Sequence, residues 1–215
     1  MNKFEFIPNQ KGQSMKGVDM TGKQEVIEQI LALELKMFLA VPTTHKYSCQ
    51  ENPEGFKLHR RAQFAAWSRA TLESYLNDLH QAEKDGQNLL TVKYARMENM
   101  LPRCNFSTLI ETVGDMIMEE QRVFISNYPY LMLRGRPLNE QESQPGLTSF
   151  ETYLKGELET YSEETLELLH RDILALKENG ASFSEKIYQY LAVEWGFESL
   201  EKLEKTLRVK YSQQK

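Results

Sequence analysis

The sequence predicts an all-α, single-domain bundle of about seven or eight helices, and three observations support this prediction. Apolar residues recur at helical spacing through most of the 215 residues. Alternation typical of a β-strand is confined to residues 3–7. Hydrophobic residues make up 40% and charged residues 27% of the chain, which is typical of a globular protein rather than a disordered or fibrous one.

The N-terminal part of the chain divides at the first helix. Residues 1–22 contain glycines, asparagines and a proline without a sustained apolar period, and they predict a flexible arm ahead of a helical domain over residues 23–215. Thr21 followed by Gln24 is the pattern of a capping box, which opens a helix. Helical spacing then continues until Pro42 ends it.

The next helices are bounded by turn residues. Residues 56–84 keep a helical period without glycine or proline, and they predict one long helix or two nearly collinear helices that end at Asp85-Gly86. A further helix is predicted over residues 88–101, and another over residues 107–127.

An irregular stretch over residues 128–145 separates these helices from the C-terminal ones. Loops of this length are often mobile or functional, so this stretch is a candidate lid. Thr148 and Glu151 form a second capping-box pattern, which opens a helix that ends at Tyr161. Three more helices are predicted, over residues 162–177, 184–194 and 199–210.

Charged side chains occur where several helices should be apolar. On a helical wheel, Glu34 falls in the middle of the apolar arc of the first helix. Lys93 lies at the centre of an apolar stripe, with Tyr94 and Arg96 at its margins. Further polar residues on apolar faces include Arg60, Gln63, Asp78 and Glu157. Because an isolated buried charge is costly, each of these charges predicts a partner.

We expect these residues to converge on a polar pocket between the helices that binds a small anionic metabolite or cofactor. In this interpretation Arg60 and Lys93 hold the anion, while Glu34 or Glu157 acts as a catalytic general acid or base. The pocket is expected to use Trp67 and Tyr161 as apolar walls, and Gln63, Asp78, Tyr94 and Arg96 as further ligand-binding residues. The pattern leaves the cofactor unknown and does not decide whether the protein is an enzyme.

Two other classes of protein stay open. The buried charges could be structural ion pairs of a non-catalytic interaction protein, with a partner bound near the loop from Pro129 to Pro145. A metal-carboxylate enzyme is the third class, but only Glu167 and His170 form a Glu-x-x-His pair, and the known bundle sites use two such pairs. We therefore predict no metal site.

Charge and cysteine content limit the classes of binding partner and the cellular compartment that we expect. A net charge of −5 argues against nucleic acid and against an anionic membrane surface, because both require a basic footprint. No stretch approaches the roughly 18 apolar residues of a membrane-spanning helix. The only cysteines are Cys49 and Cys104, and the first residues do not form a secretion signal, so we expect a cytoplasmic protein.

Four strings of residues resemble an uncharacterised bacterial family, a helical domain of unknown function. They are Cys49-Gln50 with Phe56 and RRAQFAAW at residues 60–67, SYLNDL at 74–79, KYARM at 93–97 and TSFETYLKGELETYS at 148–162. The resemblance extends from the first helix to the C-terminus and implies no particular activity, substrate or cofactor. It does imply that the polar residues on the apolar helix faces lie in or beside the family's signature strings.

Overall fold

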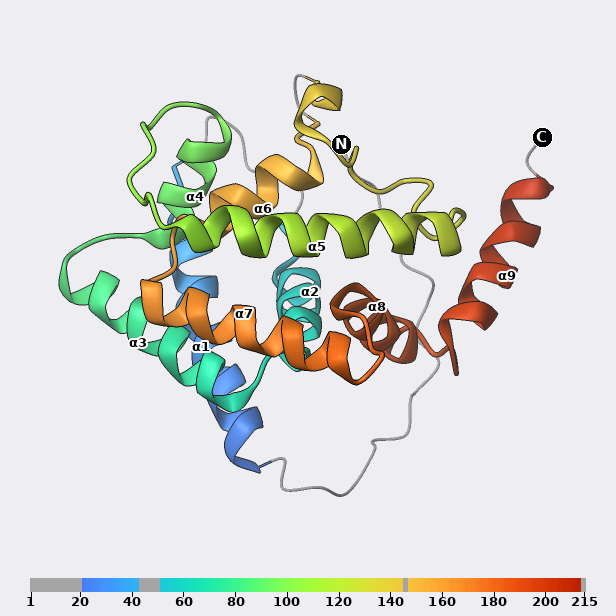
Figure 1. Ribbon diagram of the computed structural model, residues 1–215, viewed down its shortest axis with the longest axis horizontal. Helices are drawn as coiled ribbons and strands as arrows, with labels where there is room; N and C mark the ends of the chain where they lie inside the picture. Colours follow the sequence, from blue (N-terminus) through green and yellow to red (C-terminus); the bar gives the residue numbers. More distant parts are fainter. Residues whose placement is uncertain (1–20, 43–50, 145–146, 214–215) are drawn as a thin grey trace.

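The computed structural model in Figure 1 describes residues 21–42, 51–144 and 147–213. These residues form α-helices and one short 3-10 turn, with no strand among them, which confirms the all-α prediction. The helices are α1 (Thr21–Leu39), α2 (Pro53–Ala65), α3 (Arg69–Lys84), α4 (Leu89–Met97), α5 (Thr108–Asn127), α6 (Phe150–Leu158), α7 (Glu163–Glu178), α8 (Phe183–Glu194) and α9 (Leu200–Ser212), and the 3-10 turn is η1 (Glu140–Glu142).

The described residues contain nine α-helices, slightly more than the seven or eight predicted, because the segment over residues 56–84 divides. The side chain of Ser68 accepts a hydrogen bond from the backbone of Thr71, so a new helix begins after it. Several predicted boundaries also move. α2 begins at Pro53 rather than at residue 56, and α6 ends at Leu158 rather than at Tyr161. Asn99, with a φ of 55°, closes the turn after α4 earlier than expected. At α6 the N-cap is Ser149, one residue beyond the predicted Thr148.

Some sequence predictions fall on residues that the structure does not describe. The predicted arm over residues 1–22 lies outside the described residues except for Thr21 and Gly22, which already belong to α1. Cys49 also lies outside them.

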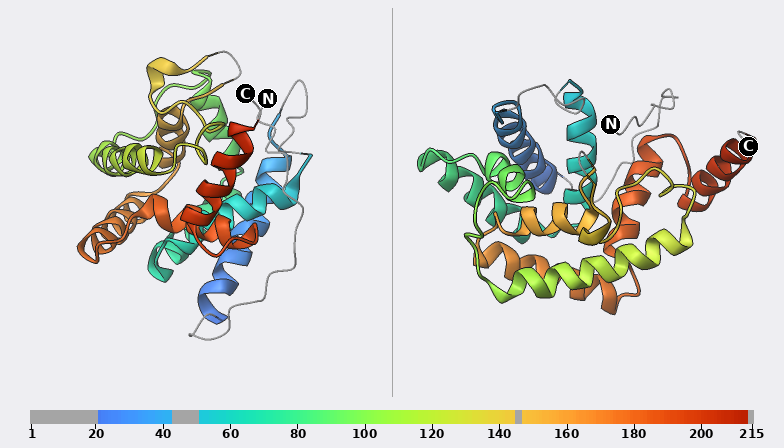
Figure 2. Two further views of the ribbon diagram at one scale, coloured as in Figure 1. Left: turned by 90° about the vertical axis from the view of Figure 1, so that its right-hand side faces the viewer. Right: turned by 90° about the horizontal axis from the view of Figure 1, so that it is seen from above.

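The core lies between the long helices. Its largest fully buried side chains include Ile30 of α1, Phe64 of α2, Leu72 of α3 and Ile173 of α7. A smaller apolar cluster around Phe124 joins α5, α8 and α9. In Figure 1 and in the right-hand view of Figure 2, α9 lies at one edge of the molecule.

The helices α1–α4 and α5–α8 share one packing arrangement. α1 packs against α2, α3 and α4, and α5 packs in the same way against α6, α7 and α8. The two groups meet through α3 against α7, which lie side by side in Figure 1, and through the matching pairs α2–α8 and α4–α6. The described part of the chain therefore has an approximate twofold arrangement, with α9 outside it.

The central helices α3 and α7 also match in detail. Each is 16 residues long. Each begins after a serine N-cap, Ser68 or Ser162, and each is followed by a glycine at positive φ, Gly86 at 68° or Gly180 at 66°. A residue with a side chain would be strained at either glycine, so both helices stop at the same place.

Candidate functional site

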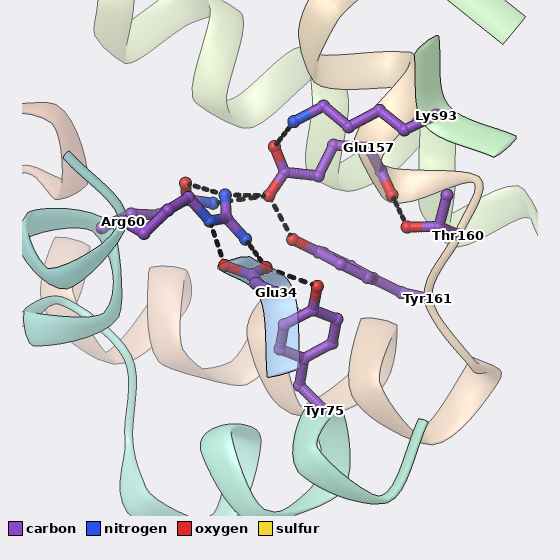
Figure 3. A network of polar contacts seen from close by, with 8 residues as sticks. Glu34, Arg60, Tyr75, Lys93, Glu157, Thr160 and Tyr161 are labelled. Carbon is purple, nitrogen blue, oxygen red and sulfur yellow. Dashed lines mark hydrogen bonds and ion pairs between the residues drawn. The ribbon is translucent and has the colours of Figure 1, made fainter. Parts of the chain in front are cut away.

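Two cations and two carboxylates meet in the interior, as Figure 3 shows, and we refer to Glu34, Arg60, Lys93 and Glu157 as the charge cluster. They come from α1, α2, α4 and α6. The exposed fractions of these residues are 0, 5, 3 and 3%, respectively. The four helical-wheel positions that carried the sequence hypothesis are thus brought together in one place.

Arg60 and Glu34 join α2 to α1. The Arg60 guanidinium donates from Nε to Oε2 of Glu34 at 2.7 Å and from Nη2 to Oε1 at 2.5 Å. This is the bidentate geometry that a planar guanidinium forms with a carboxylate. The hydroxyl of Tyr75 on α3 donates to Oε1 of Glu34 at 2.7 Å, so both oxygens of this carboxylate are engaged.

Glu157 is the most heavily bonded carboxylate of the cluster. Its Oε2 accepts from Nζ of Lys93 at 2.7 Å. Its Oε1 accepts from Nη1 of Arg60 at 2.5 Å, from the Tyr161 hydroxyl at 2.6 Å and from Nε2 of Gln63 at 3.1 Å. Gln63 also accepts from Nη1 of Arg60 at 2.7 Å, which fixes the guanidinium further. Glu157 therefore joins α6 to both α2 and α4.

The backbone around Lys93 explains why α4 can approach α6. Asn88 caps the start of α4 and donates from its side chain to the backbone oxygen of Met37 at 2.8 Å, which ties α4 to the end of α1. Gly156 faces α4, where a Cβ would lie 3.0 Å from Cγ of Met97 and 3.4 Å from the backbone oxygen of Lys93. A glycine at this position permits the contact.

Aromatic rings surround the two cations. Nζ of Lys93 lies 3.6 Å from the centre of the Tyr153 ring, and the Arg60 guanidinium lies 4.7 Å from that of Phe64. Such contacts stabilise a desolvated cation. Tyr75 and Tyr153 are not among the site residues that the sequence predicts. The signal at Tyr75 was a hydroxyl on an apolar helix face, since a buried tyrosine normally finds a hydrogen-bond partner.

The environment fixes the protonation of several groups. Burial acts to raise the pKa of Glu157, but the charges of Arg60 and Lys93 and the hydrogen bonds outweigh it and hold this pKa well below its usual range. Burial and the neighbouring carboxylates raise the pKa of Tyr75 and of Tyr161 well above the usual value. At neutral pH Glu157 is therefore an ionised acceptor, and both tyrosines are neutral donors.

Little free space remains at the charge cluster. The adjoining cavity measures about 10 Å³ and is lined by the cluster together with Tyr75, Leu89, Leu90 and Thr160. This volume holds about one water molecule. The two cations and the two carboxylates also balance in formal charge. A metabolite can reach Arg60 and Lys93 only if a group that now fills the site moves.

Other predicted site residues lie beside the cluster. The ring of Trp67 is 1% exposed and packs edge-on against Tyr75 and Tyr161, with both pairs of ring centres 5.7 Å apart. Its buried Nε1 finds no hydrogen-bond partner among the described residues. The ring of Tyr94 lies 5.9 Å from Nζ of Lys93. Trp67 and Tyr161 thus form a wall next to the cluster.

Arg96 and Asp78 take part in different contacts. Arg96 forms a bidentate ion pair with Glu159, at 2.5 and 3.0 Å. Asp78 of α3 accepts from the backbone of Ser162 at 3.0 Å and from the hydroxyl of Thr165 at 2.7 Å, so it caps the start of α7. A carboxylate at a helix N-terminus is stabilising there.

Residues of the metal hypothesis do not gather in the described structure. Glu167 is exposed and pairs with Arg171 at 3.7 Å, and His170 is half-buried. In the described ranges, no group of three or more histidine, cysteine, aspartate or glutamate side chains is arranged to hold a metal ion. None of the described helices is long and apolar enough to span a membrane.

Comparison with known proteins places the chain in a family. No curated protein and no solved structure matches it. One family model, described as "Protein of unknown function (DUF4125)", matches residues 24–205, which include the whole charge cluster. The resemblance found in the sequence is therefore confirmed at the level of a family whose function is unknown. The chain belongs to the DUF4125 family.

Proposed function

We propose that the protein binds a small anionic metabolite or cofactor at Arg60 and Lys93, and that Glu157 takes the place of the ligand's anionic group in the unliganded protein. The observation that carries this proposal is the convergence of two buried cations from different helices on both oxygens of one carboxylate. A guanidinium and an ammonium, with Tyr161 and Gln63 as neutral donors, are the groups that recognise a carboxylate or a phosphate.

Ligand entry in this proposal is an exchange of anions. The cavity of about 10 Å³ admits no metabolite, so the Glu157 carboxylate must leave Arg60 and Lys93 when the ligand arrives. Glu157 is the residue before the last one of α6, so a change in the final turn of this short helix is enough to withdraw it.

This exchange couples binding to a proton. Arg60 and Lys93 are what keep the pKa of Glu157 low against the effect of burial. When a ligand neutralises these cations, burial dominates and the pKa of Glu157 rises. We therefore expect binding to be accompanied by proton uptake, which calorimetric titrations in buffers of different ionisation enthalpy measure. Glu157 could then act as a general acid, as the sequence hypothesis requires.

The proposal is tested by retained ligands and by thermal stabilisation. The protein as purified is analysed by native mass spectrometry, and its melting temperature is measured with phosphate and with small mono-, di- and tricarboxylates. We expect a stabilising anion whose effect is lost in Lys93→Met and Arg60→Met. Arg61→Met is the matched control, because Arg61 follows on the same helix but pairs at the surface with Glu28. Unchanged anion binding in both Lys93→Met and Arg60→Met would overturn the proposal.

We also propose that the protein is bacterial and cytoplasmic. The family resemblance supports the first point. The second is supported by the low cysteine content, since a chain of 215 residues has only two cysteines and Cys104 is an exposed free thiol.

A second candidate function is a non-catalytic interaction protein, and a specific surface favours it. The loop between α4 and α5 exposes Met100 at 70%, Leu101 at 41% and Phe106 at 76%. Adjacent exposed apolar side chains often mark a protein contact. In this case the charge cluster is structural. Analytical ultracentrifugation of the wild type and of Met100→Ser/Phe106→Ser tests self-association through this loop, and identical sedimentation over a wide concentration range would argue against it.

A further inference from the structure

The two helical groups are related in sequence as well as in packing. Residues 68–78 read SRATLESYLND and residues 162–172 read SEETLELLHRD, so serine, threonine, leucine, glutamate and aspartate coincide. The coinciding positions lie 94 residues apart, the same separation as between Gln63 and Glu157. The matching serines cap α3 and α7, and the matching aspartates, Asp78 and Asp172, each cap the other helix.

The first helices of the two groups follow the same buried pattern. In α1 the buried residues include Val26, Ile30, Glu34 and Met37, and in α5 residues at the same spacing, Val113, Ile117, Gln121 and Phe124, are buried. Glu34 thus corresponds to Gln121. Equal spacing of buried side chains means that α1 and α5 present equivalent faces to the helices that pack on them.

Equivalent residues also meet at the centre of the molecule. Gln63 donates to its counterpart Glu157 at 3.1 Å, and the ring of Trp67 packs on that of its counterpart Tyr161. Residues related by a twofold rotation touch each other only near the rotation axis. A local twofold axis therefore passes between these pairs, at the border of the charge cluster.

The two halves differ in charge at equivalent interior positions. Where the first half has Glu34, Arg60, Tyr75 and Lys93, the second half has the buried Gln121, Leu154 and Leu169 and the partly buried Ile187. The reverse holds at one pair, Gln63 and Glu157. Gln121 is neutral and accepts a hydrogen bond from the hydroxyl of Ser184 at 3.1 Å. The second half therefore keeps the same helix packing without a buried cation or carboxylate at these positions.

We infer that the chain is a tandem duplication of one four-helix unit. Three charged residues of the first unit, together with Glu157 of the second, form a site that is not repeated and that binds one ligand per chain. The ligand part rests on the proposed function above. Burying ions is costly, yet neutral residues at the equivalent positions support the same packing in the second half. The charge cluster is then a specialisation for binding, which the fold does not require.

The test replaces each member of the charge cluster by the residue at the equivalent position of the other half, which for Glu157 is Gln63. The neutral variant is Glu34→Gln/Arg60→Leu/Lys93→Ile/Glu157→Gln. We expect it to give a dispersed amide NMR spectrum and a melting temperature at or above that of the wild type. By contrast, Glu157→Gln alone leaves two buried cations, Arg60 and Lys93, with one buried carboxylate, Glu34. This variant is expected to lower the melting temperature by roughly 10 °C. A smaller variant, Lys93→Ile/Glu157→Gln, should be more stable than Lys93→Ile alone. Lys93→Ile leaves two buried carboxylates that share one cation, Arg60, and the second change removes the excess negative charge.

The outcomes separate the two proposals. A neutral variant that is molten, and a double variant less stable than Lys93→Ile, would overturn the inference that the fold does not need the charges. A folded neutral variant supports it, whatever the ligand result. The proposed function is tested separately, by measuring whether anions raise the melting temperature of the wild type and whether this effect is lost in the neutral variant. If no anion of the panel stabilises the wild type, the single-ligand site is overturned while the duplication stands.

Discussion

Replacing Glu157 by glutamine is expected to destabilise the protein strongly. The change keeps the shape of the side chain, but it removes the negative charge that faces Arg60 at 2.5 Å and Lys93 at 2.7 Å. It also turns an amide N–H₂ toward one of these donors. Breaking a buried ion pair by removing one partner costs about 3–5 kcal/mol. At roughly 2–4 °C per kcal/mol for a domain of this size, the melting temperature falls by about 6–20 °C.

The matched control for this prediction is Glu83→Gln. Lys36 pairs with Glu83 at the same 2.5 Å that separates Arg60 from Glu157, but the side chains are 72% and 43% exposed. Solvent screens such a pair, so we expect no measurable loss. Urea unfolding, followed by circular dichroism, gives the free energy of unfolding of both variants. Equal stability of Glu157→Gln and Glu83→Gln would refute the reasoning that burial makes this ion pair costly to break.

Three further predictions concern acid pH, alkaline pH and helix capping. Because the pKa of Glu157 is low in the folded state, its stabilisation is present above the unfolded value of 4.5 and is lost as the pH falls below it, and Glu157→Gln should flatten this acid limb. Tyr75 and Tyr161 have raised pKa values, so stability is full below pH 10 and falls as the pH rises further; urea midpoints that stay constant to pH 11 would contradict this. Asp172→Ala removes a carboxylate that accepts a hydrogen bond at 2.6 Å from the backbone N–H of Ser68, the N-cap residue of α3. In chemical denaturation this change should lower the free energy of unfolding by about 1.5–3 kcal/mol. The control, Asp115→Ala, alters an exposed residue and should lower it much less.

The sequence located the charge cluster because each member breaks the apolar period of its own helix. All four members of the cluster are buried. Each pairs with an opposite charge, as a buried ion is expected to do. The helical wheel could not show what the Asp78 carboxylate contacts. A helical wheel shows that a carboxylate faces inward, but it does not show whether that carboxylate meets a cation or the N-terminus of another helix.

The division of residues 56–84 into two helices has a local and a nonlocal cause. The stretch contains no glycine or proline, so nothing in it breaks the helical period. The start of α3 is fixed by the N-cap of Ser68 and by Asp172, which lies 104 residues away in sequence and accepts from the Ser68 backbone at 2.6 Å. A bond of this kind is visible only in the folded chain.

The internal repeat is difficult to recognise in the sequence alone, because the two halves share few identical residues. The separation here is 94 residues, and the clearest similarity is confined to the first eleven residues around the starts of α3 and α7. Outside them the halves share spacing and burial rather than residue identity, as Glu34 and Gln121 illustrate. The packing of α1–α4 and α5–α8 reveals the relation.

Native mass spectrometry of the wild type and the neutral variant, loaded side by side with the same anions, decides whether the charge cluster binds a ligand. We expect one small anionic adduct per wild-type chain and none on the neutral variant, with both proteins folded. Spectra in which the two proteins carry the same adduct, or in which neither carries any, would contradict the claim that the charge cluster binds a ligand.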